Sequence, residues 1–96
     1  MDLDLIVKGG RIATAADVFE ADIGVKDGTV VRIGRDLTGA ARVVDATGRW
    51  VLPGGIDSHV HMAQPSGEGV TMADGFASGT RSALFGGNTT VMPFCL

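Results

Sequence analysis

Both histidines of the chain stand two positions apart, in the stretch GGIDSHVHM that runs from Gly54 to Met62. On a strand, side chains at positions i and i+2 point to the same side, so Asp57, His59 and His61 form one polar stripe. Two imidazoles at this spacing can reach one metal ion, because each metal–nitrogen bond is only about 2.0 to 2.1 Å long. The spacing therefore favours ligation of a divalent metal by His59 and His61.

An alternative is that the two histidines are partly exposed, hydrogen-bonded and without any chemical role. The surrounding sequence favours the metal, because Gly54-Gly55 leads into the pair and a Gly-rich loop and a helical pattern follow it. If this strand is the first of a barrel, His61 lies at its carboxyl end, where the active sites of such barrels are found.

The amino-acid composition limits the classes of partner that this protein is expected to bind. The chain has 96 residues, is 45% hydrophobic, and carries a net charge of −3 from eight basic and eleven acidic residues. Without a basic stripe or a Lys/Arg cluster, neither a nucleic acid nor a membrane surface is expected as partner. The N-terminus does not fit a signal peptide, and Cys95 is the only cysteine, which fits a reducing cytosol. We expect a cytoplasmic, soluble protein, with Cys95 in a buried strand.

Residues 1–53 have the rhythm of short strands separated by turns. Gly9-Gly10 predicts a tight turn after the first strand, and Asp27-Gly28 between two alternating runs predicts a β-hairpin. Residues 42–45 and 49–52 add two short strands. We expect a small antiparallel sheet.

From residue 54 the pattern changes to strand, helix and strand. Residues 55–61 have the length of a strand, residues 71–85 show helical periodicity, and residues 88–96 are rich in β-branched side chains. Thr71 and Asp74 resemble a capping box, and Gly86-Gly87 predicts a left-handed stop. One helical face is predicted to carry Phe76, Thr80, Ala83 and Leu84.

A helical crossover between two strands makes those strands parallel. Parallel strands occur almost only in sheets that helices cover on both faces, and one β-α-β unit cannot cover itself. We therefore expect residues 54–96 to be the opening of a larger α/β domain.

The segments DLIVKGGRI, ADIGVKDGTVVRIG, VVDATGRWVLPGGIDSHVHM and FASGTRSALFGGNTTVMPF together resemble the N-terminal part of a cyclic amidohydrolase of the hydantoinase and dihydropyrimidinase family, in the amidohydrolase superfamily. The match covers essentially the whole chain. It implies an α/β protein in which residues 1–53 are a small β-sheet, or β-sandwich, segment. Residues 54–96 would be the first β-α-β unit of a TIM-like metal-dependent hydrolase barrel, here truncated. The resemblance makes His59 and His61 metal ligands and leaves Asp57 a structural neighbour.

The resemblance also implies parts that this chain lacks. The family is expected to hold two divalent metals, zinc in the first place, bridged by a carboxylated lysine, with two further histidines and an aspartate that transfers protons. Lys8 and Lys26 both fall in the β-sheet segment, so neither is the bridging lysine. We therefore expect no catalytic residue within the 96 residues and no activity from this chain alone.

The residues after His61 bear on the substrate. Dihydroorotases carry an arginine two positions after the second histidine, where its fork binds a carboxylate, whereas this chain has Ala63. Allantoinases tend to show an acidic residue before Pro-Gly, whereas this chain reads Gln64-Pro65-Ser66-Gly67. A neutral ring, a hydantoin or a dihydropyrimidine, is favoured, and an allantoinase-like or dihydroorotase-like activity is the alternative. Met62, Gln64 and Pro65 are the expected substrate contacts, unless the loop 62–70 is merely solvated.

A non-enzymatic function is a further alternative. Relatives that have lost their metal ligands act as scaffolds through protein contacts, but this chain retains both histidines. Another alternative is that the chain is a fragment that serves only as a β-sheet module or assembly piece. For the enzyme, the expected partners are the rest of its own barrel and further copies of the chain, in a homo-oligomer such as a homotetramer.

Overall fold

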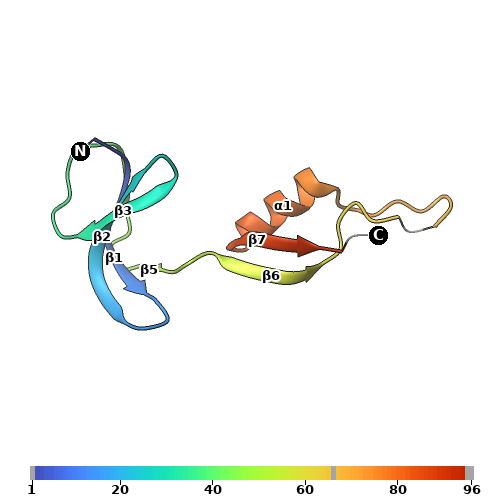
Figure 1. Cartoon of the computed structure of the whole chain (residues 1–96), viewed down its shortest axis with the longest axis horizontal. Helices are drawn as coiled ribbons and strands as arrows, with labels where there is room; N and C mark the ends of the chain where they lie inside the picture. The colour runs from blue at the N-terminus through green and yellow to red at the C-terminus, as the bar shows by residue number, and fades with distance from the viewer. Residues whose placement is uncertain (1, 66, 95–96) are drawn as a thin grey trace. The chain divides into compact units, whose positions relative to one another are not determined.

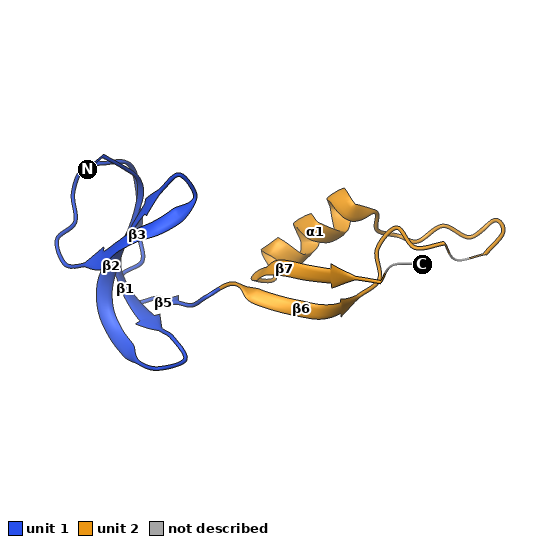
Figure 2. Ribbon diagram, viewed as in Figure 1, with its two compact units in different colours: residues 1–53 blue, residues 54–96 orange. Residues whose placement is uncertain are grey.

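The structure is a computed structural model and describes residues 2–65 and 67–94, so Cys95 and the end of the last predicted strand lie outside the described residues. The chain divides into two compact units, residues 1–53 and 54–96 (Figure 2). The order of the elements is shown in Figure 1. Within the described ranges, no helix has the length and apolar character that crossing a bilayer requires.

The first unit is a five-stranded sheet in the order β3-β2-β1-β4, with β5 also paired to β1. Its strands are β1 (Leu3–Ala13), β2 (Val18–Lys26), β3 (Thr29–Gly34), β4 (Ala40–Asp45) and β5 (Trp50–Val51).

The predicted hairpin is confirmed. Strands β2 and β3 pair antiparallel, with Ile23 opposite Ile33. The two turn residues, Asp27 and Gly28, have φ angles of 49° and 73°. Two consecutive positive φ angles are what a type I′ turn needs, and Asp-Gly adopts them at low cost.

The turn predicted at Gly9-Gly10 is wrong. Strand β1 runs through both glycines, and its pairing with β2 shifts register between Val7 and Gly10. Gly9 has a φ angle of 72°, so the glycine supplies the positive φ of a β-bulge instead of a chain reversal. The reversal comes later, where the N–H of Thr14 donates to the carbonyl of Asp17 over 2.9 Å.

The expectation of a purely antiparallel sheet is wrong, because the sheet of the first unit is mixed. Both β4 and β5 pair with β1 in parallel. Residues 35–39 make this possible because they cross the sheet back to the start of β1, where the N–H of Leu3 donates to the carbonyl of Gly39. The crossing segment places Leu37 in the core with Leu3 and Ile6, and these three side chains are at most 6% exposed.

The second unit contains β6 (Gly55–Val60), α1 (Phe76–Phe85) and β7 (Asn88–Pro93), and α1 packs on β7 (Figure 1). Strands β6 and β7 pair in parallel, which confirms the predicted β-α-β unit. Pairing is close at the start of the strands, where a Cβ on Gly54 would overlap the side chain of Thr89.

The helix begins at Phe76, five residues later than predicted, and its N-cap Gly75 makes no side-chain capping bond. The supposed capping box fails because Asp74 is used elsewhere. Its carbonyl accepts from the N–H of Ala63, and its carboxylate accepts from the hydroxyl of Ser78. The C-terminal stop is confirmed, since Gly87 has a φ angle of 92° and its N–H donates to the carbonyl of Leu84.

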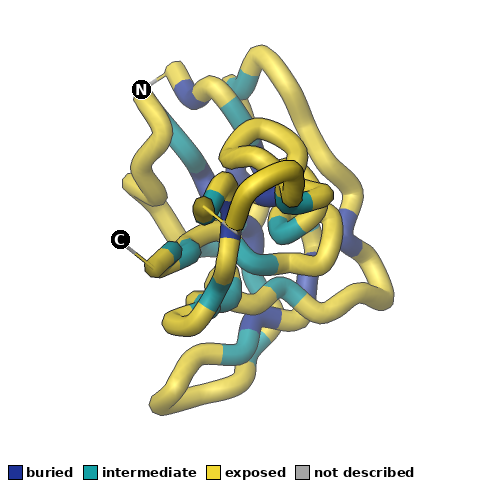
Figure 3. Tube along the Cα trace, turned by 90° about the vertical axis from the view of Figure 1, so that its right-hand side faces the viewer, coloured by how far each residue is buried: buried dark blue, intermediate teal, exposed yellow. Residues whose placement is uncertain are grey.

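Most described residues of the second unit are exposed. The trace of the whole chain is predominantly yellow, the colour of exposed residues (Figure 3). Phe76 and Leu84 on the predicted helical face are 57% and 61% exposed, and Ile56 on β6 is 67% exposed. Gly79 is the one buried residue of α1. A two-stranded sheet and one helix therefore leave apolar side chains without a covering layer.

Candidate metal centre

Both histidines lie at the carboxyl end of β6. His59 is on the strand, His61 is the first residue after it, and both side chains are exposed. The β6 strand is short and β-branched at Ile56 and Val60, with Gly54-Gly55 admitting the close approach of β7 at its start. Because β6 and β7 are parallel, the residues that follow β7 come to the same edge as the histidines.

The two imidazoles converge through their Nε2 atoms, which lie 3.3 Å apart. The rings meet edge to face, with centroids 5.2 Å apart and an interplanar angle of 63°. Two nitrogens that share a tetrahedral zinc ion at bond lengths of 2.0–2.1 Å are about 3.3–3.4 Å apart. The observed separation fits a shared metal. In the part of the chain that the structure describes, no group of three or more His, Cys, Asp and Glu side chains comes together.

Asp57 turns its carboxylate to its own strand. Its Oδ1 accepts a hydrogen bond of 3.1 Å from the backbone N–H of His59. This is the local side-chain to backbone bond that aspartate commonly makes. The contact supports a structural role for Asp57 next to the histidines.

Gln64, which was predicted to contact a substrate, contacts the imidazole of His61. Its Oε1 is 2.6 Å from Nδ1 of His61. The backbone N–H of Gln64 donates to the sulfur of Met72 over 3.2 Å. The side chain therefore reaches the imidazole nitrogen that points away from His59.

Phe94, directly after β7, is a neighbour of the site that sequence reasoning missed. Its ring centroid lies 4.6 Å from that of His59 and 4.5 Å from that of His61. Its backbone N–H donates to the carbonyl of Val60 over 3.1 Å, which ties the ends of both strands together. The available signal was the β-α-β pattern itself, since it brings the ends of both strands to one edge.

The other two predicted substrate residues are placed differently. Met62 is buried at 8% exposure, and a Cβ on Gly79 of α1 would come within 2.8 Å of its sulfur. Met62 therefore packs the loop onto the helix, and only a glycine at position 79 leaves it room. Pro65 is exposed and lines a shallow pocket with Gln64, Val70 and Met72.

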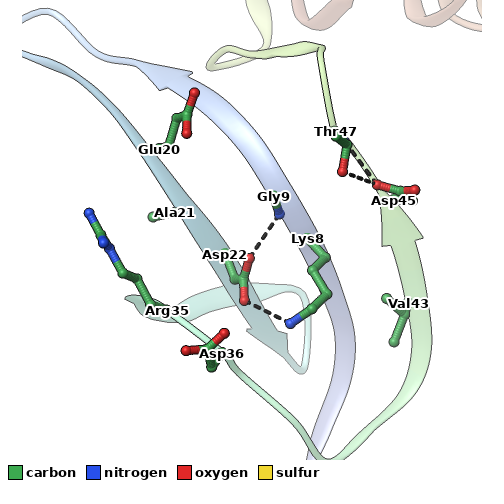
Figure 4. Close-up of a pocket in the computed structure, with 10 residues that line it drawn as sticks. All are labelled: Lys8, Gly9, Glu20, Ala21, Asp22, Arg35, Asp36, Val43, Asp45 and Thr47. Atoms are coloured by element: carbon green, nitrogen blue, oxygen red, sulfur yellow. Dashed lines mark hydrogen bonds and ion pairs between the residues drawn. The ribbon is translucent and has the colours of Figure 1, made fainter.

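A second pocket lies wholly within the first unit and is built around Asp22 (Figure 4). Gly9 and Lys8 donate to its two carboxylate oxygens over 2.8 and 3.0 Å. The N–H of Leu37 also donates to it, over 3.1 Å. The pKa of Asp22 lies below its ordinary value of 3.8. The hydrogen bond from Gly9 lowers it most and that from Lys8 lowers it next, while desolvation acts in the opposite direction. Both oxygens are used to hold β1, β2 and the crossing segment together, so this carboxylate is structural.

Comparison with known proteins gives a consistent set of relatives, although no family model matches the chain. A D-hydantoinase of Geobacillus stearothermophilus is 51% identical over 92 residues, which are 95% of this chain and 19% of that protein. An allantoinase of Rubrobacter xylanophilus is 49% identical over 87 residues, 90% of this chain and 18% of that protein. The chain thus spans about one fifth of the length of the curated relatives it matches.

Solved structures show the same likeness. The D-hydantoinase from Bacillus sp. AR9 superposes with a TM-score of 0.88 at 47% identity, over 97% of this chain and 20% of that one. An N-acyl-D-glutamate deacylase from Bordetella bronchiseptica, solved with zinc and a phosphonate inhibitor, matches 62% of this chain and 13% of that one, with a TM-score of 0.57 at 40% identity.

Proposed function

Because this chain belongs by sequence and by fold to the hydantoinase and dihydropyrimidinase family of cyclic amidohydrolases, we propose that it is the metal-binding opening of an enzyme that hydrolyses a cyclic amide. The observation that carries this proposal is the convergence of the His59 and His61 Nε2 atoms at 3.3 Å. In this reading residues 1–53 are the β-sandwich segment, and residues 54–96 begin the catalytic barrel.

We assign one divalent metal, zinc, to His59 and His61. When bound, such a metal polarises an amide carbonyl and activates a water molecule near neutral pH. The chain's own contribution is to hold two imidazole nitrogens at a separation that suits one ion, beside the Phe94 ring. Support for zinc comes from the deacylase, whose structure contains it.

The remaining machinery would come from outside these 96 residues. A tetrahedral or five-coordinate metal needs more ligands than two imidazoles. The second metal, the carboxylated lysine that bridges the pair, two further histidines and the proton-transferring aspartate are assigned to the rest of the barrel. We place the enzyme in the cytoplasm as a homo-oligomer, in keeping with the family resemblance.

The substrate that we propose is a neutral ring, a hydantoin or a dihydropyrimidine. Ala63 stands where an arginine would bind a substrate carboxylate, and it has a φ angle of 49° in the turn that leads to the loop. Gln64 and Pro65 line the pocket of this loop, and Met62 supports the loop from the side of α1. Allantoin is the second candidate, because an allantoinase shares 49% identity with this chain.

Substitution of the histidines tests the proposal in the full-length protein. His59→Ala and His61→Ala should each lose bound zinc and nearly all ring opening of hydantoin and dihydrouracil, because a ligand nitrogen is removed. Metal analysis and steady-state kinetics measure both effects. Ser58→Ala is the matched control, since Ser58 directly precedes His59 on β6 and is exposed. Unchanged zinc content and turnover in both histidine variants would refute the assignment.

The substrate class is tested separately with the unaltered enzyme. The value of kcat/KM should be highest for hydantoin or dihydrouracil, lower for allantoin, and lowest for dihydroorotate, whose carboxylate finds no arginine at position 63. A preference for dihydroorotate would contradict the neutral-ring proposal while leaving the metal site intact.

A further inference from the structure

The contact between Gln64 and His61 is short, and its chemistry is directional. The amide oxygen of a glutamine carries no hydrogen and can only accept a hydrogen bond. With Oε1 at 2.6 Å from Nδ1, the proton of a neutral imidazole must therefore sit on Nδ1 of His61. The lone pair is then on Nε2, the atom that lies 3.3 Å from Nε2 of His59.

We propose that Gln64 is a positioning residue that fixes the tautomer and the ring orientation of the metal ligand His61. This inference rests on the proposed metal site and adds a role that the substrate-contact hypothesis for Gln64 does not contain. A ligating histidine binds metal through one nitrogen and gives the proton of its other nitrogen to an acceptor, which holds the ring in place. In this chain the acceptor comes from the loop directly after β6.

The conformation of the loop after β6 brings the Gln64 side chain back to His61. Ala63, between Met62 and Gln64, has a φ angle of 49°, and its N–H donates to the carbonyl of Asp74 over 2.9 Å. Met62 is buried against Gly79 on one side of this turn. On the other side, the N–H of Gln64 donates to the sulfur of Met72. The backbone of positions 62–64 is thus held at three points while the glutamine side chain reaches the imidazole.

The orientation of the Gln64 amide group determines which imidazole nitrogen of His61 carries the proton. If the NH2 group faced Nδ1, it would demand a lone pair there and leave the proton on Nε2, which could not bind a metal. Glutamate at this position has two acceptor oxygens and no donor when ionised, so it reproduces the observed contact in either orientation. Methionine has a similar length and only a weak acceptor, so it removes the contact with little change in shape.

The test measures metal affinity in the full-length protein. Zinc affinity is determined by competition with a chromophoric chelator for the unaltered protein, Gln64→Met, Gln64→Glu and Pro65→Ala, with Gln64→Ala as a second loss-of-contact variant. We expect Gln64→Met and Gln64→Ala to weaken zinc binding about tenfold or more, which is the usual effect of removing the partner of a ligating histidine. Gln64→Glu should bind zinc at least as tightly as the unaltered protein. Pro65→Ala, in the same loop but without contact to His61, should be unchanged.

The spectrum of the cobalt-substituted protein is a second measurement, and it responds to the ligand geometry and not to the loop alone. The visible absorption of bound cobalt(II) reports the geometry of its ligands, so it should change in Gln64→Met and be restored in Gln64→Glu. Zinc affinity and a cobalt spectrum that stay unchanged in Gln64→Met, with KM alone raised, would overturn the inference and leave Gln64 a substrate contact. If His61→Ala itself retained the metal, the proposed metal site would fail, and the inference with it.

Discussion

The two imidazoles have different neighbours, and this difference distinguishes the effects of single substitutions. Of the two imidazoles, Gln64 approaches that of His61, at its Nδ1, whereas the ring of Phe94 contacts both. Loss of Gln64 should therefore affect one ligand, and loss of Phe94 should affect the separation between the two. Neither residue is itself able to bind zinc firmly, so both act through the histidines.

Phe94→Ala is predicted to weaken metal binding by loosening both rings. Each aromatic pair at centroid distances of 4.5 and 4.6 Å contributes about 0.5–1.5 kcal/mol beyond its buried area, so zinc affinity should fall roughly tenfold. Chelator competition on the full-length protein measures this. Phe94→Tyr is the matched control and should retain the affinity, because it keeps the ring. Equal affinities in the Ala and Tyr variants of Phe94 would count against ring packing.

Among the elements, the connection between β3 and β4 determines how the first unit is built. Residues 35–39 cross the sheet and are held there by the Asp22 carboxylate, which accepts from Leu37 on this segment. The same carboxylate accepts from Gly9 and Lys8 on β1 (Figure 4). As a residue, Asp22 is only 6% exposed. One ionised side chain thus links β1, β2 and the crossing segment.

This arrangement predicts an acid-sensitive first unit. The folded pKa of Asp22 lies below its ordinary value of 3.8, first because of the bond from Gly9 and then because of that from Lys8. A lowered folded pKa adds stability above the unfolded pKa, and this contribution is lost as the pH falls below 3.8 through the folded value. Urea midpoints measured over an acidic pH series that spans this ordinary value should show the loss.

Asp22→Asn should lower the urea midpoint at pH 6 and flatten its decrease toward acid, because the neutral amide no longer titrates there. Asp2→Asn, at an exposed position before β1, is the matched control and should leave the profile unchanged. An Asp22→Asn profile that is parallel to that of the unaltered protein would show that another group causes the acid sensitivity.

At the scale of the whole molecule, the second unit exposes the side chains that a barrel would cover. Ile56, Phe76 and Leu84 are each more than half exposed, and Phe85 is 82% exposed. Large apolar side chains left exposed in this way indicate a unit that packs against something else. The proposed occupant is the remainder of the barrel, whose helices and strands would flank β6 and β7.

The isolated 96-residue chain is therefore predicted to bind zinc weakly, to associate with other copies, and to be inactive. Two nitrogen ligands are half of the set that a tetrahedral zinc site needs, and the proposed proton-transferring group is absent from this segment. Zinc calorimetry, light scattering and a hydantoin assay on the purified chain measure these properties. Tight zinc binding with turnover by a monomer of this length would contradict the proposal of an incomplete site.

The sequence by itself determined the features that depend on local chemistry. The Asp27-Gly28 hairpin and the Gly86-Gly87 stop follow from the φ angles that these residues adopt at low cost. The His59-x-His61 pair on one side of a strand follows from the two-residue period, and the parallel strands follow from the helical crossover between them. Each of these depends on neighbours within a few positions or on one connection.

Only the tertiary structure decided which distant residues meet. The parallel pairing of β4 with β1 depends on a connection that crosses the sheet, and Gly9 could serve a bulge as well as a turn. The contacts of Gln64 and Phe94 with the imidazoles require a loop and a second strand to return to the end of β6. Composition and periodicity do not encode these encounters, because pairing and close packing between remote segments select one arrangement from several that satisfy the same local preferences.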